Sequence, residues 1–109
     1  MDISPFFITD EYGYSLCLDT GEGFCREIFA AREHEGFEGS GYDWDALVAQ
    51  YLNECMPYLI QYVIFDSEAG MFCAMSEDRE VLEDLAKGLI ELSQDKDRMA
   101  DIFSRAEHI

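Results

Sequence analysis

Two pairs of strand-forming segments, each pair separated by a short run of turn residues, constrain the fold of this chain more than any other feature. Residues 5–8 and 14–18 form the first pair, and Asp10–Gly13 between them supplies turn-forming residues. Residues 62–65 and 71–75 form the second pair, with the sequence DSEAG between them. Because the two strands of a hairpin pair antiparallel, the sequence predicts an antiparallel sheet of about four strands.

The second hairpin differs from the first in its hydrophobicity. Its strands are apolar almost without interruption, and strands of that kind are typically buried on both faces. We therefore expect both of them in the centre of the sheet, with Gly70 free to take a left-handed conformation in the turn. The order of the four strands stays open at this level.

The helical spacing of apolar residues predicts two helices after each hairpin. A short helix is expected from Phe24 to about Glu33. The next helix begins with Asp43 as its N-cap, buries an apolar stripe that includes Trp44, and ends before Pro57. Trp44 is expected to anchor this helix to the sheet.

Two further helices are expected in the C-terminal third of the chain. Ser76 is predicted to cap the first of them, which carries a leucine-rich apolar stripe, and Ser93 or Asp95 to start the second. The resulting order β-β-α-α-β-β-α-α is typical of an α+β fold. We predict one α+β domain over residues 1–109, with three to four helices packed on the antiparallel sheet.

The charge of the chain restricts its partners. There are 24 acidic and 7 basic residues, which give a formal net charge of −17. Nucleic acids and anionic membrane surfaces would repel such a protein, so we expect neither as a partner. A basic protein would be attracted, and electrostatic steering raises association rates by roughly 10- to 1,000-fold at low salt. An acidic excess can also serve solubility alone.

The acidic residues are distributed unevenly along the chain. No lysine or arginine occurs between Glu33 and Asp78, whereas residues 77–109 hold ten acidic and five basic residues. The mixed charges of the C-terminal part are typical of solvated helix faces. The sequence therefore predicts a one-sided acidic surface formed mainly by residues outside the C-terminal helices.

The cysteines and the N-terminal segment favour a cytoplasmic protein. No CxxC pair is present, so a structural zinc site is not expected. The segment MDISPFFITDEYG lacks the basic and apolar regions of a signal peptide, and no apolar run approaches the ~20 residues of a membrane span. We therefore expect reduced thiols. The four cysteines are Cys17, Cys25, Cys55 and Cys73.

The segment GFEGSGYDW, residues 36–44, places three glycines directly before a predicted helix, an arrangement that elsewhere binds phosphate. Its spacing is not that of a P-loop, no lysine follows it, and no clear strand precedes it. Acidic residues surround the segment, and Asp43 would itself occupy the free N–H groups of the helix start. The sequence therefore argues against a phosphate or nucleotide site.

Carboxylates can also bind metal ions or catalyse hydrolysis. Asp43 and Asp45 are too few ligands for an EF-hand loop, and His34 is a lone histidine between two acids. Hydrolysis by paired carboxylates requires two of them to face one cleft, which a sequence does not reveal. A metal-dependent hydrolase is kept as an alternative. We assign no catalytic residue, no metal ligand and no cofactor.

An acidic loop that contains aromatic residues suits a protein partner better than a small molecule, since Tyr and Trp are frequent interface hot spots. Phe37 and Tyr42 either pack against the fold or face the partner. Asp66 and Glu68, in the turn of the second hairpin, are outlying candidates. The predicted binding residues are Glu35, Phe37, Glu38, Tyr42, Asp43, Asp45, Asp66 and Glu68.

Two blocks of the sequence resemble a known family. GFEGSGYDW at the start of a helix, followed by FDSEAGMFCAMSEDREVLEDLA, is similar to the immunity protein 51 family of bacterial polymorphic toxin systems. The resemblance runs from about Phe24 to Arg105 and keeps both blocks in order. It implies a small cytoplasmic α+β protein without enzymatic activity that binds and blocks a cognate toxin domain.

The resemblance supplies no inhibitory residues, so the predicted site depends on the charge argument. Toxins of such systems are often nucleases, whose active sites are basic because they bind phosphate backbones. A strongly acidic inhibitor would complement such a site. The alternative is a general acidic interaction module or nucleic-acid mimic with a partner that is not a toxin. The sequence leaves the oligomeric state open.

Overall fold

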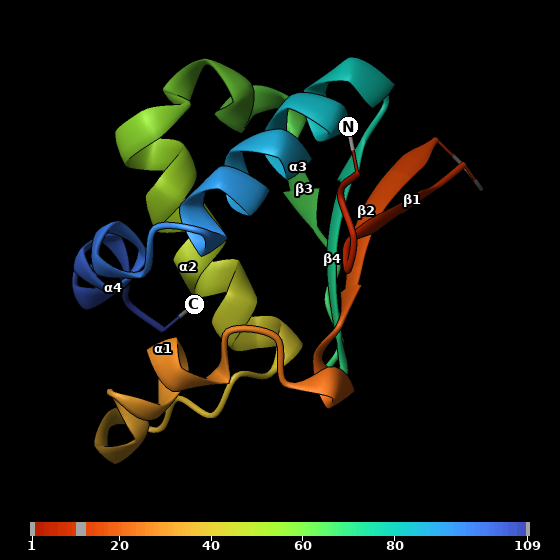
Figure 1. Ribbon diagram of the computed structural model, residues 1–109. Coiled ribbons are helices and arrows are strands. Elements are labelled where there is room, and N and C mark those ends of the chain that lie inside the picture. The colour runs from red at the N-terminus through yellow and green to blue at the C-terminus, as the bar shows by residue number, and fades with distance from the viewer. Residues whose placement is uncertain (1, 11–12, 109) are drawn as a thin grey trace.

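The computed structural model describes residues 2–10 and 13–108 (Figure 1). It is an α+β fold with a four-stranded antiparallel sheet, which confirms the predicted fold class. The elements in chain order are β1 (Phe7–Thr9), β2 (Tyr14–Asp19), η1 (Thr20–Glu22), α1 (Arg26–Ala30), η2 (Glu33–Glu35), α2 (Gly41–Cys55), η3 (Pro57–Tyr62), β3 (Ile64–Phe65), β4 (Met71–Ser76), α3 (Arg79–Ser93) and α4 (Lys96–Ser104), where η denotes a 3-10 helix.

The strand order of the sheet is β1-β2-β4-β3, so the two hairpins join through β2 and β4. We expected both strands of the second hairpin in the centre, and this is correct for β4 only. A 3-10 helix begins at Pro57 and extends to Tyr62, which leaves just two residues for β3 at the edge of the sheet. Ile64 on this edge strand is 70% exposed. Of the predicted first turn, Glu11 and Tyr12 lie outside the described residues.

One face of the sheet carries the core. Leu16 and Leu18 on β2 and Phe72 and Ala74 on β4 are fully buried, and all four α-helices lie on one side of the sheet in Figure 1. The residues that alternate with them therefore point to the opposite face, which no helix covers in that view.

Aromatic side chains fill the space between α2 and the sheet. Trp44 is buried and contacts the rings of Phe6, Phe24, Phe29 and Phe72 at centroid distances of 5.3–6.3 Å. Pairs of this kind add roughly 0.5–1.5 kcal/mol each beyond the buried area. The predicted role of Trp44 as the anchor of α2 is confirmed.

Two predicted helix caps are wrong. Ser40, not Asp43, is the N-cap of α2, because the helix begins three residues earlier and Asp43 occupies the third helical position of a capping box. Ser76 ends β4, and Asp78 caps α3 by accepting a hydrogen bond from the N–H of Glu80. Asp95 caps α4, as one of the two predicted alternatives.

The helix predicted from Phe24 to about Glu33 is shorter than expected. Only residues 26–30 form α1, and a separate 3-10 turn follows at Glu33–Glu35. Cys25 precedes α1 in a left-handed conformation (φ 58°), which prevents the helix from starting earlier.

Candidate functional site

The glycine loop, residues 36–41, meets the turn of the second hairpin, residues 66–70, at one end of the molecule. The N–H of Gly41 donates to the carbonyl of Ala69 at 2.9 Å. A Cβ atom at Gly41 would overlap the carbonyl oxygen of Glu68 and lie 2.5 Å from that of Met71. Only glycine fits here, so this part of the glycine loop serves close packing between α2 and the turn.

Asp43 holds the glycine loop in place. Its Oδ2 accepts hydrogen bonds from the N–H groups of Glu38, Gly39 and Ser40 at 2.7, 2.9 and 3.3 Å. In return the N–H of Asp43 donates to Oγ of Ser40 at 3.2 Å. Asp43 is 5% exposed and therefore supports the loop from within.

Asp45 links α2 to the hairpin turn from the inside. Ser67 Oγ donates to its Oδ1 at 2.6 Å, and the N–H of Cys73 donates to Ser67 Oγ at 2.8 Å. Asp45 is 7% exposed, and this burial raises the pKa of its carboxyl to about 6, against the opposing effect of the Ser67 hydrogen bond. Asp45 is thus also a supporting residue.

Glu35 is bound to the C-terminal part of the chain through Arg32. The Arg32 guanidinium donates two 2.8 Å hydrogen bonds to the Glu35 carboxylate, which lower the pKa of Glu35. The same guanidinium donates to the carbonyls of Phe103 and Ala106 at 2.6 and 2.7 Å. The charge of Glu35 is therefore already paired.

Phe37 lies beneath the same junction. It is 1% exposed, stacks on the ring of His108 at a centroid distance of 3.8 Å, and meets Phe103 edge-on at 4.8 Å. His108 Nε2 lies 2.7 Å from the carbonyl oxygen of Glu35. Of the two interpretations left open for Phe37, packing against the fold is correct.

The four remaining predicted residues are exposed and lie on the frame that Gly41, Asp43 and Asp45 create. Tyr42 is 54% exposed at the start of α2. The carboxylates of Glu38, Asp66 and Glu68 form no ion pair within the part of the chain that the structure describes. These four residues are Glu38, Tyr42, Asp66 and Glu68.

The fold adds two acidic residues that the sequence did not point to. Thr20 donates its N–H to the carbonyl of Gly70 at 3.1 Å, and this contact holds η1 against the hairpin turn. Asp19 precedes η1 and Glu22 is its last residue, so this contact places both exposed side chains near the turn. Their position depends on the β2–β4 pairing, and the strand order was not predictable. Below, the acidic end means Asp19, Glu22, Glu38, Tyr42, Asp66 and Glu68.

One basic residue lies beside the acidic end. Arg26 and Glu38 line the same hollow of about 370 Å³, together with Glu33 of η2. The stretch from Glu33 to Asp78 is free of lysine and arginine, but the fold places Arg26 of α1 next to it.

A second exposed surface lies at the opposite end of α2, where η3 follows the helix. Its side chains are 44–70% exposed, and we call this group the aromatic edge: Tyr58, Ile60, Tyr62 and Ile64. Tyr62 and Ile64 also line a groove of about 930 Å³ with Tyr14, Met75 and the acidic start of α3. The sequence did not reveal the exposure of Tyr62 and Ile64, because the apolar run of residues 62–65 predicted a central strand.

The described residues contain neither a candidate metal cluster nor a candidate membrane-spanning helix. Within residues 2–10 and 13–108, no three or more His, Cys, Asp or Glu side chains are grouped so that they could hold a metal ion. No helix among them is both long enough and apolar enough to cross a membrane.

Comparison with known proteins identifies the family. No curated protein and no solved structure matches the chain. The family model of Immunity protein 51 (Imm51) matches residues 6–108, nearly the whole chain. The chain therefore belongs to the Immunity protein 51 family.

Proposed function

We propose that this Immunity protein 51 family member binds and neutralises a cognate toxin domain in the cytoplasm of the cell that produces both. Family membership supports the immunity role and a toxin as the partner. Immunity proteins generally act by binding and not by catalysis, and we propose the same here. The net charge of −17 favours a toxin with a basic surface.

We assign the toxin contact to the acidic end. The observation that carries this choice is that Glu38, Asp66 and Glu68 are exposed and have no ion-pair partner among the described residues. Three internal hydrogen-bonded contacts, at Gly41, Asp43 and Asp45, hold their backbone in place. A preorganised charged surface loses little conformational freedom on binding.

A nuclease is the toxin class that this surface suits best. Nuclease active sites carry Lys and Arg because they bind a phosphate backbone. Carboxylates on a rigid frame can occupy the same positions as phosphates, while Tyr42 supplies an aromatic contact of the kind enriched in interface hot spots. The predicted residues Glu35, Phe37, Asp43 and Asp45 support this surface from within or behind it.

The first test is a titration of the C-terminal domain of the large polypeptide encoded beside this gene, at ~50 and ~300 mM salt. Screening of exposed charges changes strongly over this range. We expect tight binding whose association rate falls as salt rises. Tight binding that is indifferent to salt would contradict the acidic end and move the contact to the aromatic edge. Absence of binding at both salt concentrations would favour a partner other than this neighbour.

Charge reversal then locates the surface. The triple variant Glu38→Lys, Asp66→Lys and Glu68→Lys should slow association at least tenfold, because like charges would then face a basic toxin. The matched control reverses three exposed acids elsewhere and changes the net charge equally: Asp84→Lys, Glu91→Lys and Glu107→Lys. Equal slowing by both triples would mean that net charge alone steers binding, and an unaffected first triple would exclude the acidic end.

Gene deletions distinguish an immunity protein from a general acidic interaction module. An immunity gene becomes dispensable once its toxin gene is deleted, whereas a module with another cellular partner stays needed. Growth of the double deletion compared with the single deletion gives the answer.

A further inference from the structure

Two thiols face each other across the centre of the sheet. Cys17 on β2 is directly opposite Cys73 on β4, and their sulfur atoms are 3.7 Å apart. Both alternate with the buried residues of their strands, so both lie on the face of the sheet that the helices leave uncovered. No part of the proposed toxin contact uses them.

The backbone geometry shows which kind of cross-strand pair this is. The N–H of Cys73 donates to Ser67 Oγ at 2.8 Å, and its carbonyl accepts from the N–H of Asp66 at 2.9 Å. Both backbone groups of Cys73 thus point away from β2. Cys17 and Cys73 are therefore a non-hydrogen-bonded pair, the type in which side chains approach most closely and Cα atoms lie about 4.5 Å apart.

This separation suits a covalent bond. Disulfides span Cα distances of roughly 4.4–6.8 Å, so the strands need little movement to form one here. We infer that Cys17 and Cys73 form an oxidation site that closes into a cross-strand disulfide when the protein meets a low-molecular-weight disulfide such as glutathione disulfide. This inference is independent of the proposed function.

The reaction takes place in two thiol–disulfide exchanges. The thiolate of Cys73 attacks one sulfur of glutathione disulfide, which forms a mixed disulfide and releases one glutathione. Cys17 then attacks the Cys73 sulfur, the protein disulfide forms, and the second glutathione leaves. The two protons of the protein thiols end on the two released glutathione molecules, so glutathione disulfide is the oxidant and is reduced.

Cys73 is the thiol that reacts first. It is partly exposed, whereas Cys17 is 8% exposed and lies between its pairing partners, Phe7 on β1 and Cys73 on β4. Burial, followed by the hydrogen bond and charge of Cys73, raises the pKa of Cys17 to about 12.

The experiment uses the purified full chain, incubated with glutathione disulfide and then treated with a thiol-alkylating reagent. Peptide mass mapping should show Cys17 joined to Cys73 while Cys25 and Cys55 are alkylated. The oxidised protein should also unfold at a higher denaturant concentration than the reduced protein, because the bond constrains the unfolded chain.

Matched single variants make the result decisive. Cys17→Ser and Cys73→Ser should each abolish the intramolecular disulfide, whereas Cys25→Ser and Cys55→Ser should form it at the wild-type rate. Separate glutathione adducts on Cys17 and Cys73 without a bond between them would overturn the inference. So would a disulfide that maps to Cys25 or Cys55. Cys73→Ser serves as the second variant if Cys17→Ser folds poorly.

Discussion

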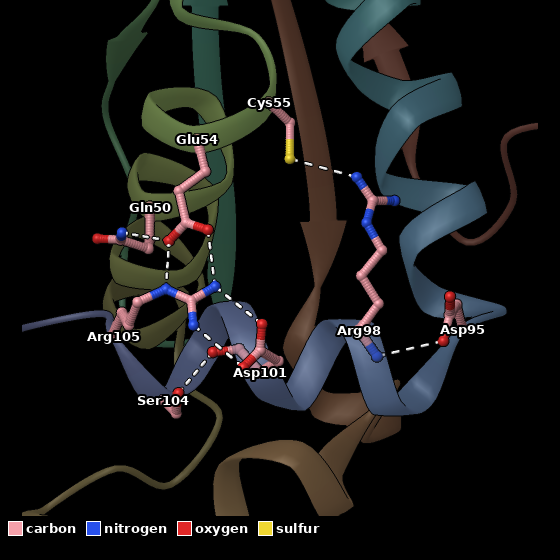
Figure 2. Close-up of polar contacts among 8 residues, drawn as sticks. All are labelled: Gln50, Glu54, Cys55, Asp95, Arg98, Asp101, Ser104 and Arg105. Carbon is pink, nitrogen blue, oxygen red and sulfur yellow. Dashed lines mark hydrogen bonds and ion pairs between the residues drawn. The ribbon is translucent and has the colours of Figure 1, made fainter.

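The two ends of α2 use their carboxylates in opposite ways. At the N-terminal end, Asp43 and Asp45 are buried and are held by backbone N–H groups and by the Ser67 hydroxyl, with no basic side chain involved. At the C-terminal end, Glu54 is exposed and is held by Arg105 and Gln50 (Figure 2). The described residues thus form a hydrogen-bonded frame at one end and a cluster of ion pairs at the other.

Figure 2 shows how the ion pairs join two helices. Arg105, just after α4, donates to both oxygens of Glu54 on α2 at 2.8 and 2.7 Å. It also donates to both oxygens of Asp101 at 3.1 and 3.0 Å. The single guanidinium thus pairs with two carboxylates between α2 and α4.

The position of the ion pairs explains which part of the surface carries the unpaired acidic residues. Of the seven basic residues, four form ion pairs with carboxylates in the described chain: Arg32, Arg79, Lys96 and Arg105. Three of these, Arg32, Lys96 and Arg105, attach other parts of the chain to the α4 region. Within the described residues the acidic end receives no such pair, so its carboxylates stay exposed and unpaired.

We expect the largest loss of stability from a substitution that breaks the hydrogen-bonded frame at the N-terminal end of α2. Asp43→Ala removes the acceptor of three backbone hydrogen bonds and one side of the capping box. We expect a loss of about 3 kcal/mol in the free energy of unfolding, because buried N–H groups then lack a partner. Urea unfolding followed by circular dichroism measures it.

The matched control is Asp43→Asn, which keeps an oxygen acceptor without the charge. It should retain part of the lost stability. If Asp43→Ala unfolds at the wild-type urea concentration, the loop does not depend on this carboxylate and the proposed rigid frame is wrong.

The second prediction concerns how the stability contributed by Asp45 at the N-terminal end of α2 depends on pH. Burial raises the Asp45 pKa from its ordinary value near 4 to about 6, so the folded state prefers the neutral carboxyl. The stability that this preference contributes is fully present below pH 4 and is lost as pH rises through 6. Asp45→Asn should therefore equal the wild type near pH 4 and exceed it by about 2 kcal/mol at pH 8.

Unfolding free energies of both proteins at pH 4, 6 and 8 give this difference directly, and the titration of the other acids cancels in the comparison. A variant that is less stable than the wild type at pH 8 would mean that the ionised Asp45 is the form that supports the turn.

The smallest expected effect concerns the ion pairs at the other end. Hydrogen bonds from Arg105 and Gln50 lower the Glu54 pKa to about 2. The stability that these bonds contribute to the folded state is therefore present above the usual glutamate pKa and is lost as pH falls toward 2. Exposed pairs contribute little. Arg105→Gln at pH 7 should destabilise the protein less than Asp43→Ala, and by an amount that shrinks at high salt.

Thermal unfolding at ~50 and ~500 mM salt measures this loss. The control for losing a charge is Lys87→Gln on α3, an exposed residue without an ion pair among the described residues. A loss from Arg105→Gln larger than that from Asp43→Ala would reverse the proposed ranking of the two ends.

Local patterns explain why much of the fold was predictable. Hairpin turns, helical apolar stripes and the anchoring role of Trp44 depend on residues close in sequence. Even the cap of α2 was readable, since Ser40 and Asp43 have the spacing of a capping box. The interpretation failed there because Asp43 is a good N-cap on its own.

The candidate site was less predictable because its arrangement depends on contacts between distant segments. Gly41 against the hairpin turn, Thr20 against Gly70, and Arg105 with Glu54 each join parts of the chain that no periodicity relates. Charge counting identified an acid-rich region, but it did not separate the buried carboxylate of Asp45 from the exposed one of Glu68.

The absence of space for a side chain at Gly41 has a consequence for how related chains diverge. A frame fixed by a glycine and two buried aspartates leaves the exposed positions Glu38, Tyr42, Asp66 and Glu68 free to change without refolding the protein. We expect lineages that face different toxins to differ first at these surface positions and to keep Gly41 and Asp43. New specificity can then arise by substitution on an inherited scaffold.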